Sequence, residues 1–342
     1  MRHDILDFEK AVPKALVSFY VDKLELEADR RSLESMYNAI NEANPDLINR
    51  LYANYSCAGR TAVNIFEEIT LPGGFLTKER MVRILQREIG EREVFGREFN
   101  PTLSEEPQIN YVEDRGDSIL IQFVAKDKPR RIRNGYDIIQ VTSVNFEFAI
   151  VRFMGPTTIE LRCAYNKHSK FLACFENYFK QELGDPAKQF EWIPITKVTN
   201  KEAEEIAKRL SAGLIEADHK DSGIYDRHLV TASPDVKNLR EQQEYVQQFK
   251  NKMLLSQSLI INVEEETMFG KYENEIKFKI NLYTGFQFLS KVSEAVIGYV
   301  MQVFIDVRYK GIKELEEAKV EVEVEVGQKK ESDVLQQETQ VI

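Results

Sequence analysis

Five cationic side chains fall within eight residues of this sequence: Lys126, Lys128, Arg130, Arg131 and Arg133. Within that segment only Asp127 opposes them. Ammonium and guanidinium groups bind phosphate oxygens and carboxylates, so the segment suits a nucleic-acid backbone or an acidic protein surface. We predict that it binds one of these two partners. The alternative is a solvated turn whose charges only keep the chain soluble.

A second group of residues has the types needed for acid–base or metal chemistry. It comprises Asp218, His219, Asp226 and His228. Imidazole and carboxylate groups together can hold a divalent metal or supply a base near neutral pH. The two histidines lie nine residues apart in a polar stretch that is typical of a solvated turn. We therefore predict no metal site here and keep a metal-dependent hydrolase as an alternative.

A nuclease of the restriction type would place an acidic residue before a strand that begins Glu-x-Lys. The sequence offers Glu275-Ile276-Lys277 after the acidic run Glu264 to Glu266. So short a pattern also arises by chance in a chain with 56 acidic residues. The sequence has no glycine-rich phosphate loop, HExxH zinc motif or GxSxG nucleophile motif. We predict no cofactor and no catalytic residues, and the nuclease joins the hydrolase as an alternative.

The basic segment lies between two runs of β-branched and aromatic residues. Four such runs follow one another, at 118–125, 136–142, 145–153 and 157–163. Short connections join strands antiparallel, because a parallel return needs a long crossover. The runs therefore predict a β-meander in which the basic segment is the first turn, at 126–135. Apolar residues at helical spacing over 169–183 predict a helix that covers one face of the sheet.

Residues 1–100 predict a helical domain, because their apolar side chains recur at helical spacing. Its last two helices are expected at 61–69 and 77–89. Residues 91–117 contain two prolines and many charges, which is typical of a linker.

Residues 118–213 are expected to form an antiparallel α+β domain that contains the meander. A fifth strand is expected at 190–195. The sequence Thr199-Asn200-Lys201-Glu202 matches a capping box, and the helix that it begins is expected to stop at Gly213.

The remaining sequence predicts a second, smaller α+β unit over 235–327. After a long polar helix up to Lys252, the expected elements are two strands, a helix and a strand, at 255–263, 275–283, 286–297 and 299–309. The last range alternates apolar and polar residues, although a helix continuing through Val303 also fits the spacing. Valine and glutamate alternate over 320–326, which is typical of an edge strand. The tail at 328–342 is expected to be disordered.

The chain has 342 residues and a formal net charge of −10. Such an acidic chain is unsuited to coating polyanions, but a local basic patch can still act because charges are screened beyond about 10 Å at ordinary salt concentrations. Three widely spaced cysteines and the lack of an apolar leader predict a reduced, cytoplasmic setting. No apolar run reaches the length that a bilayer requires, so no membrane contact is expected.

These patterns predict an α+β protein with an N-terminal helical domain, an antiparallel meander sheet covered by helices, and a second α+β unit. We predict a non-enzymatic interaction protein that contacts nucleic acid or an acidic partner through residues 126–133. Its helical domain would supply further protein–protein contacts. The alternatives are a metal-dependent hydrolase or nuclease and a purely structural subunit of an assembly. The enzyme alternatives require the acidic and histidine side chains to converge in one cleft.

Overall fold

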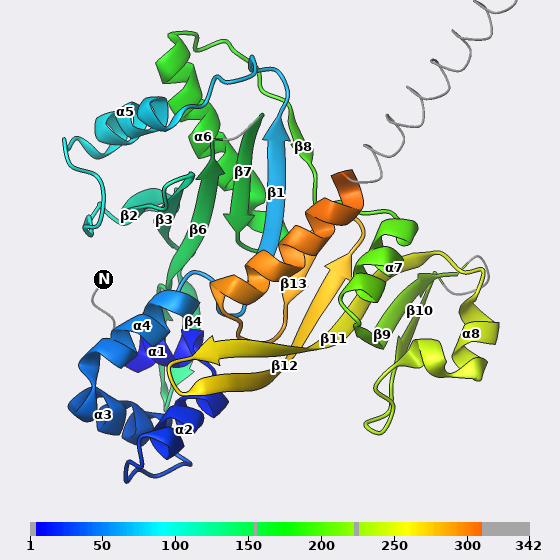
Figure 1. Ribbon diagram of the computed structural model, residues 1–342. Coiled ribbons are helices and arrows are strands. Elements are labelled where there is room, and N and C mark those ends of the chain that lie inside the picture. Colours follow the sequence, from blue (N-terminus) through cyan, green and yellow to red (C-terminus); the bar gives the residue numbers. More distant parts are fainter. Residues whose placement is uncertain (1–4, 154–155, 222–225, 310–342) are drawn as a thin grey trace, which may run out of the picture.

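The computed structural model describes residues 5–153, 156–221 and 226–309. These residues form a mixed α+β fold around an antiparallel sheet of 11 strands, which confirms the predicted fold class (Figure 1). All but one of its strands lie in a single order across the sheet: β10 (Arg227–Thr231), β9 (Gly213–Lys220), β11 (Leu254–Thr267), β12 (Gly270–Asn281), β13 (Gly285–Phe288), β1 (Ala62–Glu68), β7 (Thr157–Arg162), β6 (Val144–Arg152), β3 (Ser118–Lys126) and β2 (Gln108–Asp114).

Strand β1 joins the two halves of this sheet. One of its edges pairs with β13 and then with β8 (Trp192–Pro194), and its other edge pairs with β7. The predicted helix at 61–69 was therefore wrong. Val63 and Ile65 enter one hydrophobic core while Phe66 enters another. Because both faces of β1 are buried, its apolar residues show no alternation that would identify a strand.

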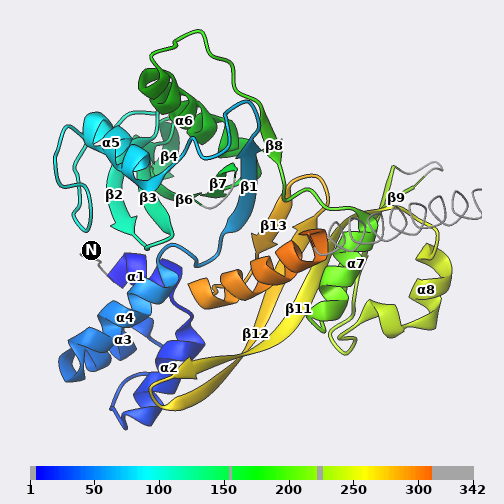
Figure 2. The same ribbon diagram turned by 45° about the horizontal axis from the view of Figure 1, so that its top comes forward.

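The half of the sheet from β7 to β2 is covered by two helices, α5 (Lys78–Ile89) and α6 (His168–Leu183), as both views show (Figures 1 and 2). The predicted apolar stripe of α6 is confirmed, since Phe171 and Phe175 pack on Phe123 of β3. Three of the four predicted meander strands are confirmed as β3, β6 and β7. Strand β2 extends their sheet from within the segment that was expected to be a linker.

The other half of the sheet is covered by α7 (Asn200–Arg209) and by a helix over residues 294–309. The predicted helix at 286–297 and strand at 299–309 were wrong, because 285–288 is strand β13 and the helix begins only at 294. The core selects the helical spacing: Val296, Val300 and Phe304 are buried. The alternation that suggested a strand instead mixes buried Met301 with exposed residues such as Tyr299 and Ile305.

Several predicted elements near this half also need correction. The polar stretch around His219 and His228, expected to be a solvated turn, holds strands β9 and β10. The long polar helix is reduced to a 3-10 turn and the short α8 (Gln243–Phe249). The capping box of α7 is confirmed. Gly213, expected to stop that helix, instead begins β9, where a Cβ would collide with the carbonyl oxygen of Lys237. The predicted strand at 320–326 and tail at 328–342 lie outside the described residues.

The N-terminal helices form a bundle with its own core. They are α1 (Ile5–Ala11), α2 (Lys14–Lys23), α3 (Leu33–Ala43) and α4 (Pro45–Tyr55). The tip of the long β11–β12 hairpin reaches this bundle (Figure 1). There the ring of Tyr272 lies 5.4 Å from that of Phe19, and the ring of Phe269 lies 5.9 Å from that of Tyr20. The bundle core is therefore closed by residues more than two hundred positions away in the chain.

We expect Phe175→Ala to lower the free energy of unfolding by about 3–5 kcal/mol, because its fully buried ring fills the space between α6 and β3. Chemical denaturation measures the loss. Phe146→Ala is the matched control: this phenylalanine is 48% exposed, so its loss should cost much less. Equal losses in the two variants would mean that α6 does not anchor this half of the sheet.

Candidate nucleic-acid interface

The basic segment lies at the root and along the first strand of a ribbon that leaves the large sheet. Strands β3 and β6 pair with each other up to Lys126 and Val144. The chain between them forms a separate antiparallel pair, β4 (Arg130–Asn134) and β5 (Asp137–Val141) (Figure 1). We call residues 127–143 the arm.

The predicted turn at 126–135 was wrong in its geometry. Three of the five cations lie on strand β4, so they follow an extended backbone and not a loop. The chain reverses later, at Gly135 and Tyr136, and the positive φ of Gly135 suits a tight hairpin. The remaining predicted meander strand, the second in sequence at 136–142, pairs with β4 and not with the runs at 118–125 and 145–153. The cations are therefore carried along a ribbon that projects from the sheet.

The pairing register sorts the side chains of the arm onto two faces. Residues opposite one another in an antiparallel pair project to the same side. We call one side the basic face; it carries Arg131, Arg133, Ile138 and Gln140. We call the other side the apolar face after Ile132, Ile139 and Val141; it also carries Arg130, Asn134 and Asp137.

The cations of the arm and its root have no acidic partner within the described part of the chain. All five are exposed, and Tyr136 at the tip is exposed completely. The isoleucines Ile132, Ile138 and Ile139 are also exposed. An isolated two-stranded hairpin is only marginally stable in water, and exposed apolar groups together commonly mark a binding surface. The arm therefore has the properties of a contact element.

Three cations that follow the arm in sequence are, in contrast, paired with carboxylates. Arg152 and Arg162 bind the carboxylate of Glu160 at 2.8 and 2.5 Å, and Lys167 binds Glu147 at 2.8 Å. These three do not extend the free positive charge of the arm.

A polar cleft of about 530 Å³ lies at the root of the arm, between the helical bundle and the sheet. Its amide side chains come from three separate segments of the chain: Asn100, Asn110, Gln122 and Asn145. Its charged lining is balanced: three cations, Lys10, Arg60 and Arg162, stand with three carboxylates, Asp7, Glu98 and Glu147. The cleft thus places hydrogen-bonding groups immediately beside the arm.

A buried ion-pair network supports the floor of this cleft. Arg162 and Glu160 are both almost completely buried, and Arg162 also contacts Glu294 at 3.3 Å. Burial alone would raise the pKa of Glu160, but Arg162 and Arg152 hold it below its usual value. Burial, reinforced by Glu294, raises the pKa of the Cys57 thiol to about 12. Cys57 is therefore a protonated structural group and not a nucleophile.

The two histidines of the metal hypothesis meet across a strand pair. His219 of β9 is directly opposite His228 of β10, so both project to the same face, where the ring of Phe249 lies 4.6 and 6.2 Å from theirs. The sequence did not predict this, because the spacing of nine residues becomes a contact only through the hairpin register. Nε2 of His219 lies 2.9 Å from the hydroxyl of Tyr245.

Two of the acidic residues near these histidines have side-chain partners, whereas Asp226 is exposed. Asp218 projects to the opposite face, where it pairs with Arg227, and Asp221 contacts His228 at 2.5 Å and Lys252 at 3.3 Å. Within residues 5–153, 156–221 and 226–309, no group of three or more histidine, cysteine and acidic side chains is arranged to hold a metal ion. Glu275, the candidate of the nuclease hypothesis, therefore belongs to no such group among these residues either.

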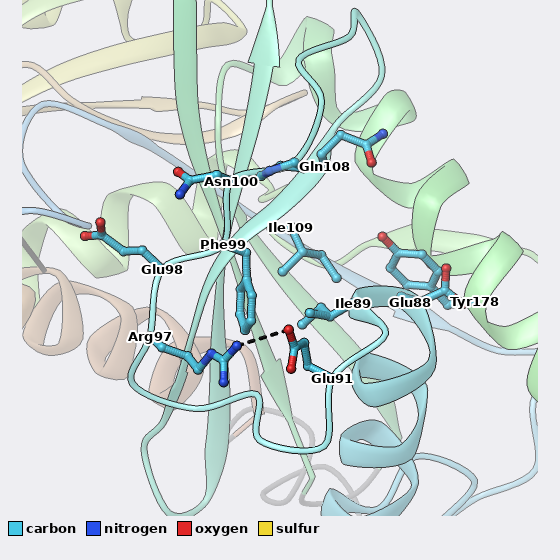
Figure 3. A pocket seen from close by; sticks show the side chains of 11 residues that line it. Glu88, Ile89, Glu91, Arg97, Glu98, Phe99, Asn100, Gln108, Ile109 and Tyr178 are labelled. Atoms are coloured by element: carbon cyan, nitrogen blue, oxygen red, sulfur yellow. Dashed lines mark ion pairs between the residues drawn. The ribbon is translucent and has the colours of Figure 1, made fainter.

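A further pocket, of about 390 Å³, lies between the end of α5 and the start of β2 (Figure 3). Arg97 pairs with Glu91 at 3.2 Å and lies over the ring of Phe99. Figure 3 shows the side chains of Glu98 and Asn100 directed away from this pair. The polar groups therefore do not converge as a catalytic constellation would require.

Comparison with protein-family models and with curated proteins gave no match for this chain. Among the described residues, no helix has the length and apolar character needed to cross a bilayer.

We expect the stability of the protein to fall as pH drops below about 6.5, and His219 to account for part of that fall. Burial lowers the pKa of His219 in the folded protein, so the unfolded chain takes up a proton at a pH where the folded chain does not. The free energy of unfolding therefore decreases from the unfolded pKa down to the folded one. Chemical denaturation at neutral and mildly acidic pH measures this, and His219→Gln should flatten the dependence. An unchanged dependence in the variant would contradict it.

Proposed function

We propose that the protein binds duplex DNA and that the arm is its main contact element. The observation that carries this proposal is the row of arginines on β4, exposed and without acidic partners among the described residues. Lysine and arginine bind duplex DNA by neutralising phosphates and releasing counterions, which is effective even on an acidic protein when the cations are concentrated locally.

The dimensions of a two-stranded ribbon favour the major groove. That groove is about 12 Å wide in B-DNA and admits a two-stranded β-ribbon, whereas the major groove of duplex RNA is too deep and narrow for side chains to read. Paired strands lie about 4.8 Å apart, so a ribbon with its side chains fits. Arg131 and Gln140, which share the basic face, are residue types that bind base edges.

The chemistry of a DNA contact agrees with the rest of this surface. The polar cleft at the root of the arm adds amide groups where a duplex on the arm would continue. Amide groups bind phosphate oxygens and base edges alike. An acidic protein surface would also attract the arginines. However, such a partner does not require a ribbon of this width, nor amide groups beside it. We therefore favour DNA and treat an acidic protein as an outcome of the test.

We expect replacement of Arg130, Arg131 and Arg133 by alanine to flatten the dependence of log affinity on log salt concentration by about two to three units, since each phosphate contact contributes about 0.9. Fluorescence anisotropy with a labelled DNA duplex at several salt concentrations measures the slope. Duplex RNA and single-stranded DNA serve as competitors. The melting temperature should stay almost unchanged, because exposed charges contribute little to folding.

The matched control removes the same charge elsewhere: Lys201, Lys208 and Lys250 are exposed and replaced together by alanine. This variant should keep the wild-type slope. If both triple variants flatten the slope equally, the effect belongs to net charge and not to the arm. If the wild-type protein binds no nucleic acid in a salt-dependent way, the acidic protein partner becomes the better hypothesis.

A further inference from the structure

An acidic groove of about 590 Å³ lies on the opposite half of the large sheet from the arm's root. It is bounded by β11, by the start of the helix over 294–309 and by Asn54 of α4. Its floor is apolar, with Val263, Val296 and Tyr299, and the last of these is 49% exposed. The groove therefore combines an apolar floor with walls supplied by three separate elements.

Four carboxylates line this groove, and the described residues of its lining include no cation. Glu264 and Glu266 are exposed at its rim, and Glu265 and Glu294 are partly buried within it. The two inner groups are engaged: Glu265 accepts a hydrogen bond from the hydroxyl of Tyr55, and Glu294 contacts Arg162. At the rim, Glu264 pairs with Lys271, which is not one of the described residues that line the groove. The site thus suits a positively charged occupant that also has apolar groups.

One edge of β11 is open along the same groove. Strand β9 pairs with β11 only as far as Ile260, while β12 continues along the other edge to Thr267. In the described part of the chain, no strand pairs with the first edge over residues 261–267. Such an edge presents backbone groups that a further strand can pair with.

The arm has the complementary properties. It is extended, it carries arginines, and its apolar face and the ring of Tyr136 are exposed. Among the residues that the structure describes, strand β4 pairs with β5 alone, so within them its other edge is open. An exposed tyrosine that enters an apolar hollow is a typical anchor of a protein interface, and opposite charges at the rim fix the orientation.

We propose that the acidic groove binds the arm of a second copy of this chain. The arginines of β4 meet Glu264 and Glu266, and the apolar groups of the arm cover Val263, Val296 and Tyr299. This self-association does not depend on DNA binding, but it uses the same arm. The two partners therefore exclude each other: a protein whose arms are docked in grooves cannot place them in a duplex, and DNA releases the copies from one another.

Two double variants test the contact from its two sides. Arg131→Glu with Arg133→Glu alters the arm, and Glu264→Lys with Glu266→Lys alters the groove. Sedimentation velocity over a range of protein and salt concentrations measures association. We expect the wild type to self-associate, more weakly as salt rises, and each double variant to weaken the association by at least about ten-fold. Glu42→Lys with Glu244→Lys is the control, since both glutamates are exposed elsewhere.

Mixing supplies the decisive measurement. The arm variant keeps an intact groove and the groove variant keeps an intact arm, so the two should associate with each other although neither associates with itself. A monomeric wild type at low salt, or a groove variant that associates like the wild type, would overturn the proposal. Binding of the groove variant to duplex DNA is measured in parallel and should be retained. If DNA binding is lost in the arm variant alone, the DNA-binding proposal stands even where self-association is not found. The two proposals can therefore fail separately.

Discussion

The structure depends on the placement of β1 in the middle of the large sheet. This strand pairs with β7 on one edge and with β13 and β8 on the other, and it supplies Val63 and Ile65 to one core and Phe66 to the other. Without it, the described strands on its two sides would form separate sheets, one ending at β13 and the other at β7. Because backbone pairing and burial on both faces act at the same residues, the two halves are held in a fixed relation.

The N-terminal bundle and the helix over 294–309 are tied to this sheet by contacts of different kinds. The hairpin tip closes the bundle core with aromatic rings, and the ion-pair network around Arg162 joins β7 to the helix over 294–309. Removing one partner of a buried ion pair leaves an uncompensated charge, which typically costs about 3–5 kcal/mol. The network is thus sensitive to single substitutions, and it keeps the polar cleft in place beside the arm.

The arm exists because β3 and β6 pair without it. Their ladder is continuous from Ser118 to Lys126, so the residues inserted between them have no place in the sheet and project from it. Burial stabilises the rest of the meander, whereas the arm keeps its isoleucines and arginines exposed. A segment so little stabilised by its own fold is suited to contacts with other molecules, and both proposals assign it such contacts.

The sequence by itself determined the α+β class, the strands β3, β6 and β7, the apolar stripe of α6 and the cluster of five cations. These features are local, because a strand between short turns or a helix with one apolar face is visible in its own residues. Only the tertiary structure decided that 62–68 is a strand, that 294–309 is one helix, and that His219 faces His228. Each of these depends on contacts that the local sequence does not show. Strand β1 is buried on both faces, so its sequence lacks the alternation typical of a strand. Helical and strand spacings both fit 299–309, and burial of one helical face in the core decides between them. The pairing register of β9 and β10 places His219 opposite His228, although they are nine residues apart.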